Sequence, residues 1–403
     1  MQYRMVPKNG DKLSALGFGC MRLPQKTLKI DEERAIGQIR YAIDHGVNYL
    51  DTAPPYHAGE SEKLLGKALL DGYREKVKVA TKLSHFMINK PEDMDKMLSI
   101  QLRKLQTDHI DYYLLHSLET EAWNKLQGFN VLKFLEKAKK EGKIVNMGFS
   151  FHGSRTTFKE IIDSNDWTMC QIQFNFLDEN LQAGTEGLQY AASKKLAVMI
   201  MEPLRGGALA GKLPKKVKQI YDNAPESRTA AEWGLRWVWN HPEVTVVLSG
   251  MNDEKQIEEN IRTCETALPN SLTGEDLEVV NKVAAVYKGL MKVPCTGCAY
   301  CMPCPNGVNI PGNFSSYNQF NMFSNKFYIR GMYAVMQMGI LHGKPSDASL
   351  CKNCGVCIKK CPQHIAIPEE LKAVKGSLGG VQTKIMIPII KTVAKRQLTT
   401  KLE

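Results

Sequence analysis

The sequence of 403 residues has no run of 18 consecutive apolar residues, and its first residues, MQYRMVPKNGDK, lack the apolar stretch of a signal peptide. These two absences predict a cytoplasmic protein without a transmembrane segment. Low-complexity segments are also missing. Hydrophobic residues make up 43% of the chain and charged residues 24%, which excludes a disordered or collagen-like chain. The length fits two or three domains, or one barrel of about 250 residues with an appendage.

A concentrated basic region is missing too. The net charge is +11, but the positive residues are dispersed, with only short runs such as Lys215, Lys216 and Lys218. Proteins that bind nucleic acid usually gather Lys and Arg on one face. We therefore expect no nucleic-acid partner.

The dinucleotide-binding motif G-x-G-x-x-G does not occur, so a Rossmann cofactor site is not supported. Instead, short apolar runs alternate with helical patterns. Apolar runs of this kind are typical of strands buried on both faces, and their alternation with helices predicts a parallel sheet. Eight such units in about 250 residues favour an α/β fold of the closed (β/α)8 barrel type over an open sheet. The predicted strands are 13–19, 47–51, 77–81, 110–116, 144–150, 170–174, 197–201 and 244–249, after a short N-terminal strand pair.

The predicted domains are a barrel over residues 1–270, a helical connector over 271–293, a cysteine-rich domain over 294–380 and a basic tail over 381–403. The tail combines the apolar segment IMIPII with Lys384, Lys391, Lys395, Arg396 and Lys401. A docking helix, a contact with a membrane surface and a solvated tail all fit this pattern, and the solvated tail is favoured.

Eight of the 11 cysteines lie between Cys295 and Cys361, whereas a disulfide-bonded protein of this length would spread them along the chain. They form two runs, Cys295-x2-Cys298-x2-Cys301-x2-Cys304-Pro305 and Cys351-x2-Cys354-x2-Cys357-x3-Cys361-Pro362. Two-residue gaps let consecutive thiolates surround one iron-sulfur cube, while the Cys before Pro reaches the other cube. The runs therefore predict two 4Fe-4S clusters in a small, mainly helical domain that resembles a two-cluster ferredoxin. A zinc site is the weaker alternative.

On this rule one cluster takes Cys295, Cys298, Cys301 and Cys361, and the other takes Cys351, Cys354, Cys357 and Cys304. Two features depart from the bacterial ferredoxin pattern: the first run closes with two intervening residues instead of three, and 46 residues separate Cys304 from Cys351. The insert is rich in aromatic residues and Met at helical spacing, so we expect it to pack around the cubes.

Four polar residues are expected at the mouth of the barrel, where the C-terminal ends of the strands lie. Asp51, Lys82 and His116 come at or just after the ends of strands two, three and four, and Tyr56 follows strand two. An ammonium beside a phenol lowers the pKa of the phenol, which can then protonate a developing alkoxide. Asp51 would hold Lys82, and neutral His116 would hydrogen-bond the substrate oxygen. Each residue alone has an ordinary structural explanation, and only the combination indicates catalysis.

Several segments resemble the aldo-keto reductases: DTAPPYHAGESEKLLGKAL from Asp51, KVATKL ending at Leu83, DYYLLHS around His116, and KIVNMGFSFHG. The resemblance covers the whole barrel. It implies a tetrad of Asp51, Tyr56, Lys82 and His116, with Tyr56 as acid and base. It also implies hydride transfer between NADP or NAD and a small aldehyde, ketone or alcohol.

The resemblance further implies a set of cofactor-binding positions, with Ser150 and Gln171 at the carboxamide. The full set is Gly19, Met21, Ser150, Gln171, Met201, Pro203, Leu204, Gly206, Ser249, Gly250, Met251, Asn252, Gln256, Glu259 and Asn260. Phe151 and Met201 depart from residues common in the family. Gly250 and Gln256 stand where basic residues often hold the 2′-phosphate, so the choice between NADP and NAD stays open, with Arg205 as a substitute cation.

Iron-sulfur cubes move single electrons, whereas a nicotinamide gives a two-electron hydride, so exchange between them needs a flavin or another mediator. The sequence contains no evident flavin motif. Three hypotheses follow: a reductase whose clusters pass electrons to a redox partner protein or a bound flavin, an electron-transfer protein on a reductase scaffold, and a reductase with structural clusters.

Overall fold

The computed structural model describes residues 1–27, 29–295, 297, 300–340 and 344–398, except for the side chains of residues 389 and 391–398. The chain forms two compact units. The barrel unit comprises Met1–Ala210 and Pro225–Val280, and the cysteine-rich unit comprises Gly211–Ala224 together with Asn281 and the residues after it.

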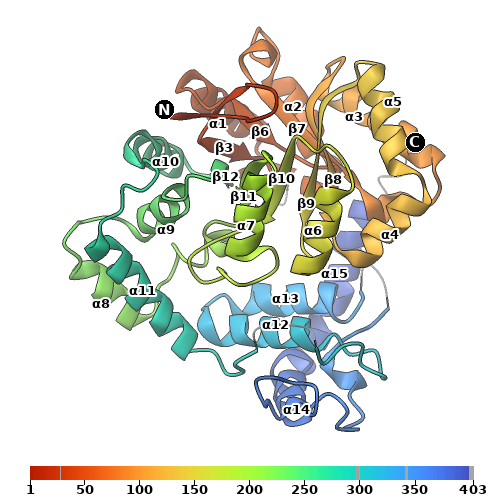
Figure 1. Cartoon of the computed structure of the whole chain (residues 1–403), viewed down its shortest axis with the longest axis vertical. Coiled ribbons are helices and arrows are strands. Elements are labelled where there is room, and N and C mark those ends of the chain that lie inside the picture. The colour runs from red at the N-terminus through yellow and green to blue at the C-terminus, as the bar shows by residue number, and fades with distance from the viewer. Residues whose placement is uncertain (28, 296, 298–299, 341–343, 399–403) are drawn as a thin grey trace. The chain divides into compact units, whose positions relative to one another are not determined.

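The barrel unit is a closed ring of eight parallel strands in the order β10-β11-β12-β3-β6-β7-β8-β9 (Figure 1). The strands are β3 (Leu16–Gly19), β6 (Tyr49–Asp51), β7 (Lys78–Ser84), β8 (Ile110–Leu118), β9 (Ile144–Phe151), β10 (Met169–Gln173), β11 (Ala197–Met201) and β12 (Val244–Ser249). Each matches one predicted segment, with ends that differ by a few residues. The predicted (β/α)8 barrel is confirmed.

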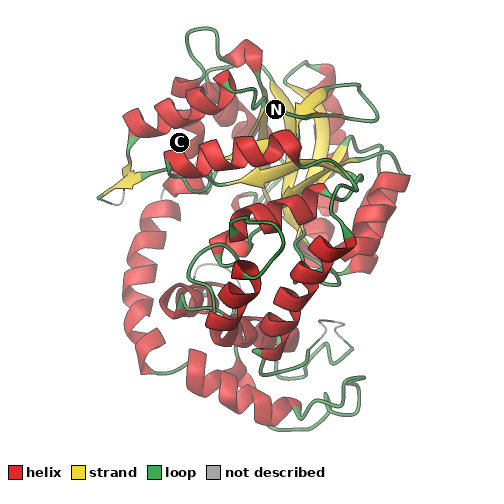
Figure 2. Cartoon of the chain, turned by 90° about the vertical axis from the view of Figure 1, so that its left-hand side faces the viewer, coloured by secondary structure: helices red, strands yellow, loops and turns green. Residues whose placement is uncertain are grey.

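Helices separate successive strands and lie outside the ring, as the strands and helices of Figure 2 show. They are α1 (Glu32–Asp44), α2 (Ser61–Ala68), α3 (Glu92–Leu105), α4 (Thr120–Gly128), α5 (Val131–Lys140), α6 (Arg155–Asp163), α7 (Gly184–Ser193), α9 (Ala230–Trp239) and α10 (Glu254–Thr266). The predicted alternation requires one helix after each strand, and α4 is additional, because α5 also lies between β8 and β9. Helix α4 has no clear start in the sequence, because its N-terminal cap is the carboxylate of Glu119, which is not among the usual capping residues.

The N-terminal hairpin of β1 (Tyr3–Met5) and β2 (Lys12–Ser14) adds Val6 and Leu13 to the core of the barrel. Inside the ring, buried side chains recur every second residue, because successive side chains of a strand point to opposite faces. Tyr49, Ala80 and Leu114 belong to this core. The next inward positions on the same strands, toward the C-terminal ends, are Asp51, Lys82 and His116. The core packing thus aims the predicted site residues at the mouth.

The cysteine-rich unit contains loops and helices. Its helices are α8 (Lys215–Asp222), the second part of α11 (Gly274–Gly289), α12 (Ile310–Met322), α13 (Lys326–Met336), α14 (Ile367–Leu378) and α15 (Val381–Leu398). Helix α8 contains the short run of Lys215, Lys216 and Lys218. Val217 and Tyr221, one turn apart, form its buried side.

The predicted basic tail is helix α15. Thr383 and Met386 are buried, and a Cβ built at Gly331 of α13 would lie 3.5 Å from Cε of Met386. The solvated-tail interpretation is therefore wrong for this part of α15, which packs on α13. The side chains of Lys391, Lys395 and Arg396, and all of Lys401, fall outside the described residues.

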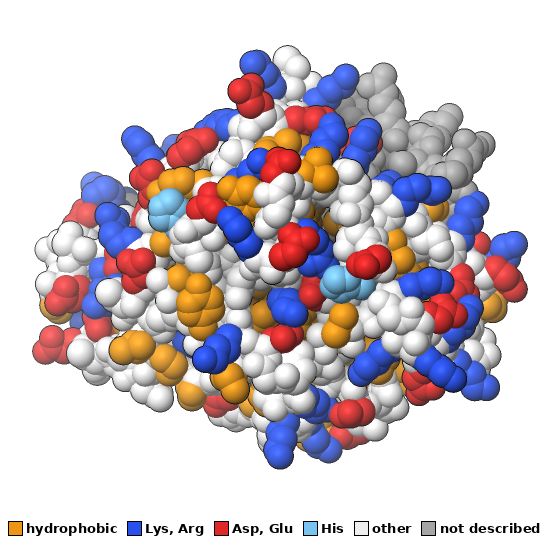
Figure 3. Space-filling view, turned by 90° about the horizontal axis from the view of Figure 1, so that it is seen from above, with side chains coloured by type: hydrophobic (Ala, Val, Ile, Leu, Met, Phe, Trp, Pro, Cys, Tyr) orange, Lys and Arg blue, Asp and Glu red, His pale blue; other side chains and the backbone are white. Residues whose placement is uncertain are grey.

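On the face shown in Figure 3, basic and acidic side chains are interspersed, in agreement with the dispersed charge of the sequence. Among the described residues, no helix has both the length and the apolar character required to cross a membrane.

Candidate functional site

Lys82 and Asp51 form a buried ion pair between neighbouring strands at the mouth of the barrel. The Lys82 Nζ donates to Asp51 Oδ1 at 2.6 Å, to Oδ2 at 2.8 Å and to the carbonyl oxygen of Thr52 at 2.8 Å. Both side chains are at most 4% exposed. The ammonium is thus held by both carboxylate oxygens of Asp51 and by a backbone carbonyl, and a hydrogen bond between Lys82 and Tyr56 also contributes to the pKa of each.

Tyr56 lies beside this pair on the 3-10 turn Tyr56–Gly59, which follows β6. The Lys82 Nζ is 5.2 Å from the centroid of the Tyr56 ring. The ring of His116, from β8, approaches the Tyr56 ring edge-on, with 6.1 Å between centroids. The structure therefore brings the four predicted catalytic residues together at one place.

The electrostatic environment fixes the charge states of two of these residues. Burial lowers the pKa of His116 well below 6.5, and the charge of Lys82 lowers it further, so the imidazole is neutral at physiological pH. Burial alone would lower the pKa of Lys82, but Asp51 and Tyr56 outweigh it and raise that pKa above 10.5. The expected neutral histidine and charged lysine agree with these directions.

The pKa of Tyr56 differs from the expected acidic phenol. Burial raises the pKa of Tyr56 above 10, and the nearby charge of Lys82 offsets only part of that rise. The prediction that Lys82 would bring the phenol below its ordinary pKa is therefore wrong for the protein alone. Without a cofactor, desolvation of the phenolate exceeds the attraction of the ammonium.

Ser84 is a site residue that the sequence analysis missed. It is fully buried and its Oγ is 2.7 Å from Nδ1 of His116, its partner across β7 and β8. The contact fixes the orientation of the imidazole ring. The signal was available in the sequence, since Ser84 lies two residues after Lys82 on the same strand and thus on the same side.

Ser150 and Gln171, expected at the carboxamide, are paired neighbours on β9 and β10 and are almost fully buried. The Oγ of Ser150 accepts a hydrogen bond from the backbone N–H of Ser117 at 2.7 Å. The Oε1 of Gln171 has no hydrogen-bond partner among the described residues. A buried acceptor without a donor is costly, so this oxygen is suited to an external amide.

The remaining expected cofactor positions surround the same mouth. Gly19 pairs with Asp51 in register, and a Cβ built there would lie 3.4 Å from the backbone oxygen of Ser249. Met201 packs against the barrel core at the end of β11. Met21 is 55% exposed on the segment after β3. Pro203, Leu204 and Gly206 follow β11, at and before the 3-10 turn Arg205–Gly207.

The segment after β12 leads into helix α10. Asn260, buried in that helix, donates from Nδ2 to Ser249 Oγ at 3.0 Å and so holds the end of the strand. Met251 is also buried, whereas Asn252 and Gln256 are exposed and linked by a bond from the Asn252 N–H to Gln256 Oε1 at 3.3 Å. The carboxylate of Glu259 accepts a hydrogen bond from the Thr229 hydroxyl.

Arg205 is not the free cation that the sequence suggested as a substitute for the 2′-phosphate residues. Its Nε donates to Asp178 Oδ2 at 2.8 Å, and the two side chains are 11% and 8% exposed. Asp178 also accepts from Gln173 and Asn175, both at 2.9 Å. The carboxylate of Asp178 neutralises Arg205, so the expectation that Arg205 would hold the 2′-phosphate is wrong.

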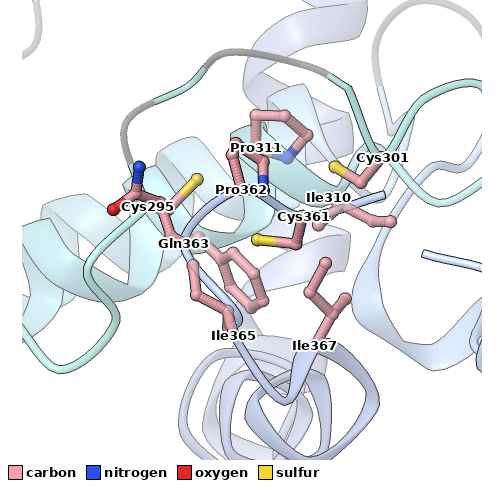
Figure 4. Close-up of a pocket in the computed structure, with 10 residues that line it drawn as sticks. Cys295, Cys301, Ile310, Pro311, Cys361, Pro362, Gln363, Ile365 and Ile367 are labelled. Atoms are coloured by element: carbon pink, nitrogen blue, oxygen red, sulfur yellow. The ribbon is translucent and has the colours of Figure 1, made fainter. Parts of the chain in front are cut away.

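In the cysteine-rich unit, Cys295, Cys301 and Cys361 line one cavity (Figure 4). Its other lining residues, mostly apolar, are Ile310, Pro311, Phe314, Pro362, Gln363, Ile365 and Ile367. The first two cysteines come from the first run and the third from the end of the second run. Phe314 confirms that the insert packs at this site, but Phe327 and Met336 of α13 are 72% and 64% exposed and do not.

The other cysteines also gather from both runs. The thiol of Cys357 lies near those of Cys351, Cys304 and Cys354; burial raises its pKa, and these three neighbours raise it further when ionised. Such a set of thiolates calls for a cation or cluster to relieve their repulsion. Cys298 falls outside the described residues, and among those described no group of three His, Cys, Asp or Glu side chains could hold a single metal ion.

Comparison with known proteins agrees with this geometry. The sequence model of the Aldo/keto reductase family matches residues 15–275, which is most of the chain and all eight barrel strands. The chain belongs to the aldo-keto reductase family. A second model, for a 4Fe-4S dicluster domain, matches residues 294–366. The chain thus joins an aldo-keto reductase barrel to a ferredoxin-type domain.

Among the relatives, the L-galactose dehydrogenase of Arabidopsis thaliana is 26% identical over 310 residues, covering 72% of this chain and 95% of that protein. The NADH-specific methylglyoxal reductase of Escherichia coli is 24% identical over 322 residues, covering 68% and 95%. Among solved structures, the holo form of an aldo-keto reductase from Bacillus halodurans has a TM-score of 0.60 at 26% identity, covering 70% of this chain and 96% of that one. These relatives match a share of this chain about the size of the barrel.

Proposed function

We propose that this aldo-keto reductase interconverts a small carbonyl compound and its alcohol with NADH or NADPH, and that two 4Fe-4S clusters serve electron transfer beside this activity. The observation that carries the first part is the buried contact of Lys82 with Asp51 next to Tyr56 and His116. One solved relative with a TM-score of 0.56, from Klebsiella pneumoniae, is described in complex with NADPH.

The residues at the mouth fit a nicotinamide cofactor. The unpartnered Oε1 of Gln171 is an acceptor for the amide N–H of a carboxamide, and the neighbouring Ser150 supplies a hydroxyl. When bound, the nicotinamide supplies a hydride for the carbonyl carbon. A carbonyl between Tyr56 and His116 would accept hydrogen bonds at its oxygen.

The proton would come from the protein. Tyr56 holds a proton on its hydroxyl because its pKa is above 10, and it gives this proton to the alkoxide oxygen that forms during reduction. The ammonium of Lys82 stabilises the resulting phenolate. In the reverse direction the phenolate takes a proton from the alcohol. Neutral His116 orients the carbonyl oxygen without competing as an acid.

The test is oxidation of NADH and NADPH by an anaerobically purified protein, measured against a panel of aldehydes and ketones. Tyr56→Phe should reduce kcat by at least about 100-fold, since general acid catalysis contributes that much. Tyr73→Phe is the matched control, because the Tyr73 hydroxyl bonds a surface carboxylate, that of Asp44, at 2.8 Å. Full turnover by Tyr56→Phe would contradict the proton-donor role.

For the clusters, we propose Cys295, Cys298, Cys301 and Cys361 as ligands of one cube and Cys351, Cys354, Cys357 and Cys304 as ligands of the other. The grouping of the described cysteines around one cavity and around Cys357 supports this assignment. About eight iron and eight sulfide per chain would be expected. Cys361→Ala should remove roughly half of the iron, whereas Cys170→Ala, at a buried cysteine of β10, should leave it unchanged.

The exposed side chains around the second cysteine run, residues 351–361, support a protein as the electron partner. Cys354, Val356 and Ile358 are exposed, and the charged side chains between residues 351 and 363 are Lys352, Lys359 and Lys360, all exposed. An exposed cluster edge with an apolar and basic rim fits an acidic one-electron carrier. Reduction of the clusters by such a carrier should slow as ionic strength rises.

Redox titration with simultaneous assays separates the alternatives. Cluster reduction that changes carbonyl turnover supports the proposal, and analysis of released cofactors would reveal a flavin mediator. Cluster reduction without any carbonyl activity would favour an electron-transfer protein on a reductase scaffold. Clusters that cannot be reduced would favour a structural role.

A further inference from the structure

Two neighbouring helices of the cysteine-rich unit expose a group of large apolar side chains. Helices α13 and α15 lie side by side (Figure 1). On α13, Tyr328, Met332 and Met336 recur every four residues and therefore share one side of the helix. On α15, Val381 and Ile385 are related in the same way. We call the exposed set the α13–α15 face; its members are Phe327, Tyr328, Met332, Met336, Val381 and Ile385.

The apolar side chains of this face are not used for packing within the unit. Phe327, Met336, Val381 and Ile385 are each at least 64% exposed. The opposite side of α13 is buried, as at Ile329, so the helix already has a side that packs on its neighbours. Exposed apolar side chains usually occur singly, whereas a cluster of them on one surface marks an interaction site.

The charged side chains around the α13–α15 face are all basic. Neither helix contains an Asp or Glu, and residues 371–402 contain none. Lys326 and Arg330 of α13 both lie over the ring of Phe320, with Lys326 Nζ at 4.7 Å and Arg330 Cζ at 4.5 Å from its centroid. These contacts hold two cations beside the apolar side chains. Lys384 is exposed on α15, next to Ile385 in the chain.

We propose that the α13–α15 face binds to the surface of a membrane that contains anionic phospholipids. Apolar side chains with only basic residues beside them suit such a surface, where the apolar groups enter the boundary of head groups and acyl chains. Lys326, Arg330 and Lys384 would contact the lipid phosphates. Among the described residues no helix is long and apolar enough to cross a membrane, so the unit would lie on its surface.

A second copy of this chain fits the face less well. In a two-fold dimer the same patch meets itself. Lys326, Arg330 and Lys384 would then approach identical cations, and the two helices provide no carboxylate to offset the repulsion. Duplex nucleic acid would attract the cations but would leave the aliphatic side chains in water. An anionic membrane uses both the charge and the apolar area.

The test is co-sedimentation of the full-length, cluster-loaded protein with vesicles of phosphatidylcholine alone, or mixed equally with phosphatidylglycerol. We expect binding to the mixed vesicles only, and weaker binding as ionic strength rises. Phe327→Gln with Met336→Gln should weaken it about 10- to 100-fold, since two apolar side chains no longer leave water. Met5→Gln with Leu268→Gln, at exposed positions of the barrel unit, is the matched control and should bind as the wild type does.

A charge variant tests the contribution of the cations. Lys326→Gln should lower the affinity for mixed vesicles about 5-fold, as expected for the loss of one basic side chain near an anionic surface. Lys133→Gln makes the same charge change at an exposed position of α5 and should have little effect. Equal losses in the two variants would show that only the net charge matters and would overturn the role of the face.

The remaining outcomes are distinct. Equal binding to both kinds of vesicle would overturn the anionic-lipid assignment, and full binding by Phe327→Gln with Met336→Gln would overturn the face itself. No vesicle binding, together with a dimer that this variant abolishes, would replace the membrane by a second copy. Unchanged iron content shows that the variant folds; if iron is lost, Lys326→Gln still decides. Because sedimentation needs no turnover, a protein without carbonyl activity would overturn the proposed function and leave this inference in place.

Discussion

The ammonium of Lys82 bonds both carboxylate oxygens of Asp51, at 2.6 and 2.8 Å, in a place that water hardly reaches. Removing one charge of a buried pair leaves the other without compensation. We therefore expect Asp51→Leu to lower the free energy of unfolding by about 3–5 kcal/mol. The double variant Asp51→Leu with Lys82→Met should recover part of this loss. Urea unfolding followed by circular dichroism measures both, and equal losses in the single and double variants would contradict the argument.

The pH dependence of turnover follows from the direction of the Tyr56 pKa. Because burial raises this pKa above 10, the phenol stays protonated between about pH 7 and pH 9, and carbonyl reduction should not fall over that range. Alcohol oxidation needs the phenolate and should rise with pH over the same range. Profiles of kcat/KM in both directions measure this, and a reduction rate that falls from pH 7 upward would contradict it.

Lys82→Met should move the same titration further up the pH scale. The ammonium lowers the phenol pKa, so its removal leaves the burial effect unopposed. The rise in alcohol oxidation should then begin at higher pH. At a fixed pH near 8, the rate of alcohol oxidation should fall about 10-fold for each increase of about one unit in the pKa of the phenol. A profile of unchanged position in Lys82→Met would show that the ammonium does not act on Tyr56.

Ser84→Ala should impair the orientation of His116. We expect kcat/KM for carbonyl reduction to fall about 10-fold, the cost of one neutral hydrogen bond, with cofactor affinity unchanged because Ser84 bonds the imidazole. Ser84→Thr keeps the hydroxyl and should retain most of the activity. Ser99→Ala, on the exposed side of α3, serves as the control. Loss of cofactor binding in Ser84→Ala would indicate a general structural role instead.

Gly66 allows helix α2 to approach α3. A Cβ built there would lie 2.4 Å from the carbonyl oxygen of Lys104 and 2.9 Å from the carbonyl carbon of Leu105, a clash with backbone. Gly66→Ala should therefore destabilise the protein, by about 1–3 kcal/mol as for other overpacked sites. Gly37→Ala in α1, where nothing lies within 4 Å, should raise stability by up to about 1 kcal/mol through helix propensity. Thermal unfolding of the two variants should shift in opposite directions.

The strands were predictable because a parallel barrel buries both faces of each strand, and runs such as those at β8 and β12 record this in the sequence. Helix α8 was not predictable from the sequence, because this short helix is rich in lysine and buries only Val217 and Tyr221. The meeting of Asp51 with Lys82 could be expected once strand ends were assigned, since parallel strands end at one rim.

The pKa of a buried residue and the contacts of a side chain between loops were harder to predict from the sequence. The direction of the Tyr56 pKa depends on how burial and the charge of Lys82 compare, and a sequence reveals the charge but not the burial. Arg205 could be recognised as a cation, but its network with Asp178 forms only in the folded loop after β10.

The grouping of the cysteines has a consequence for biosynthesis. Cys361 lies with Cys295 and Cys301, and Cys304 lies with Cys351, Cys354 and Cys357. On the proposed ligand assignment, neither cube can be completed while only the first run has left the ribosome. Helices α12 and α13 must be translated before the second run emerges, so iron delivery has to wait until the chain is nearly finished, and a nascent chain stopped before Cys351 would carry its thiols exposed to oxidation.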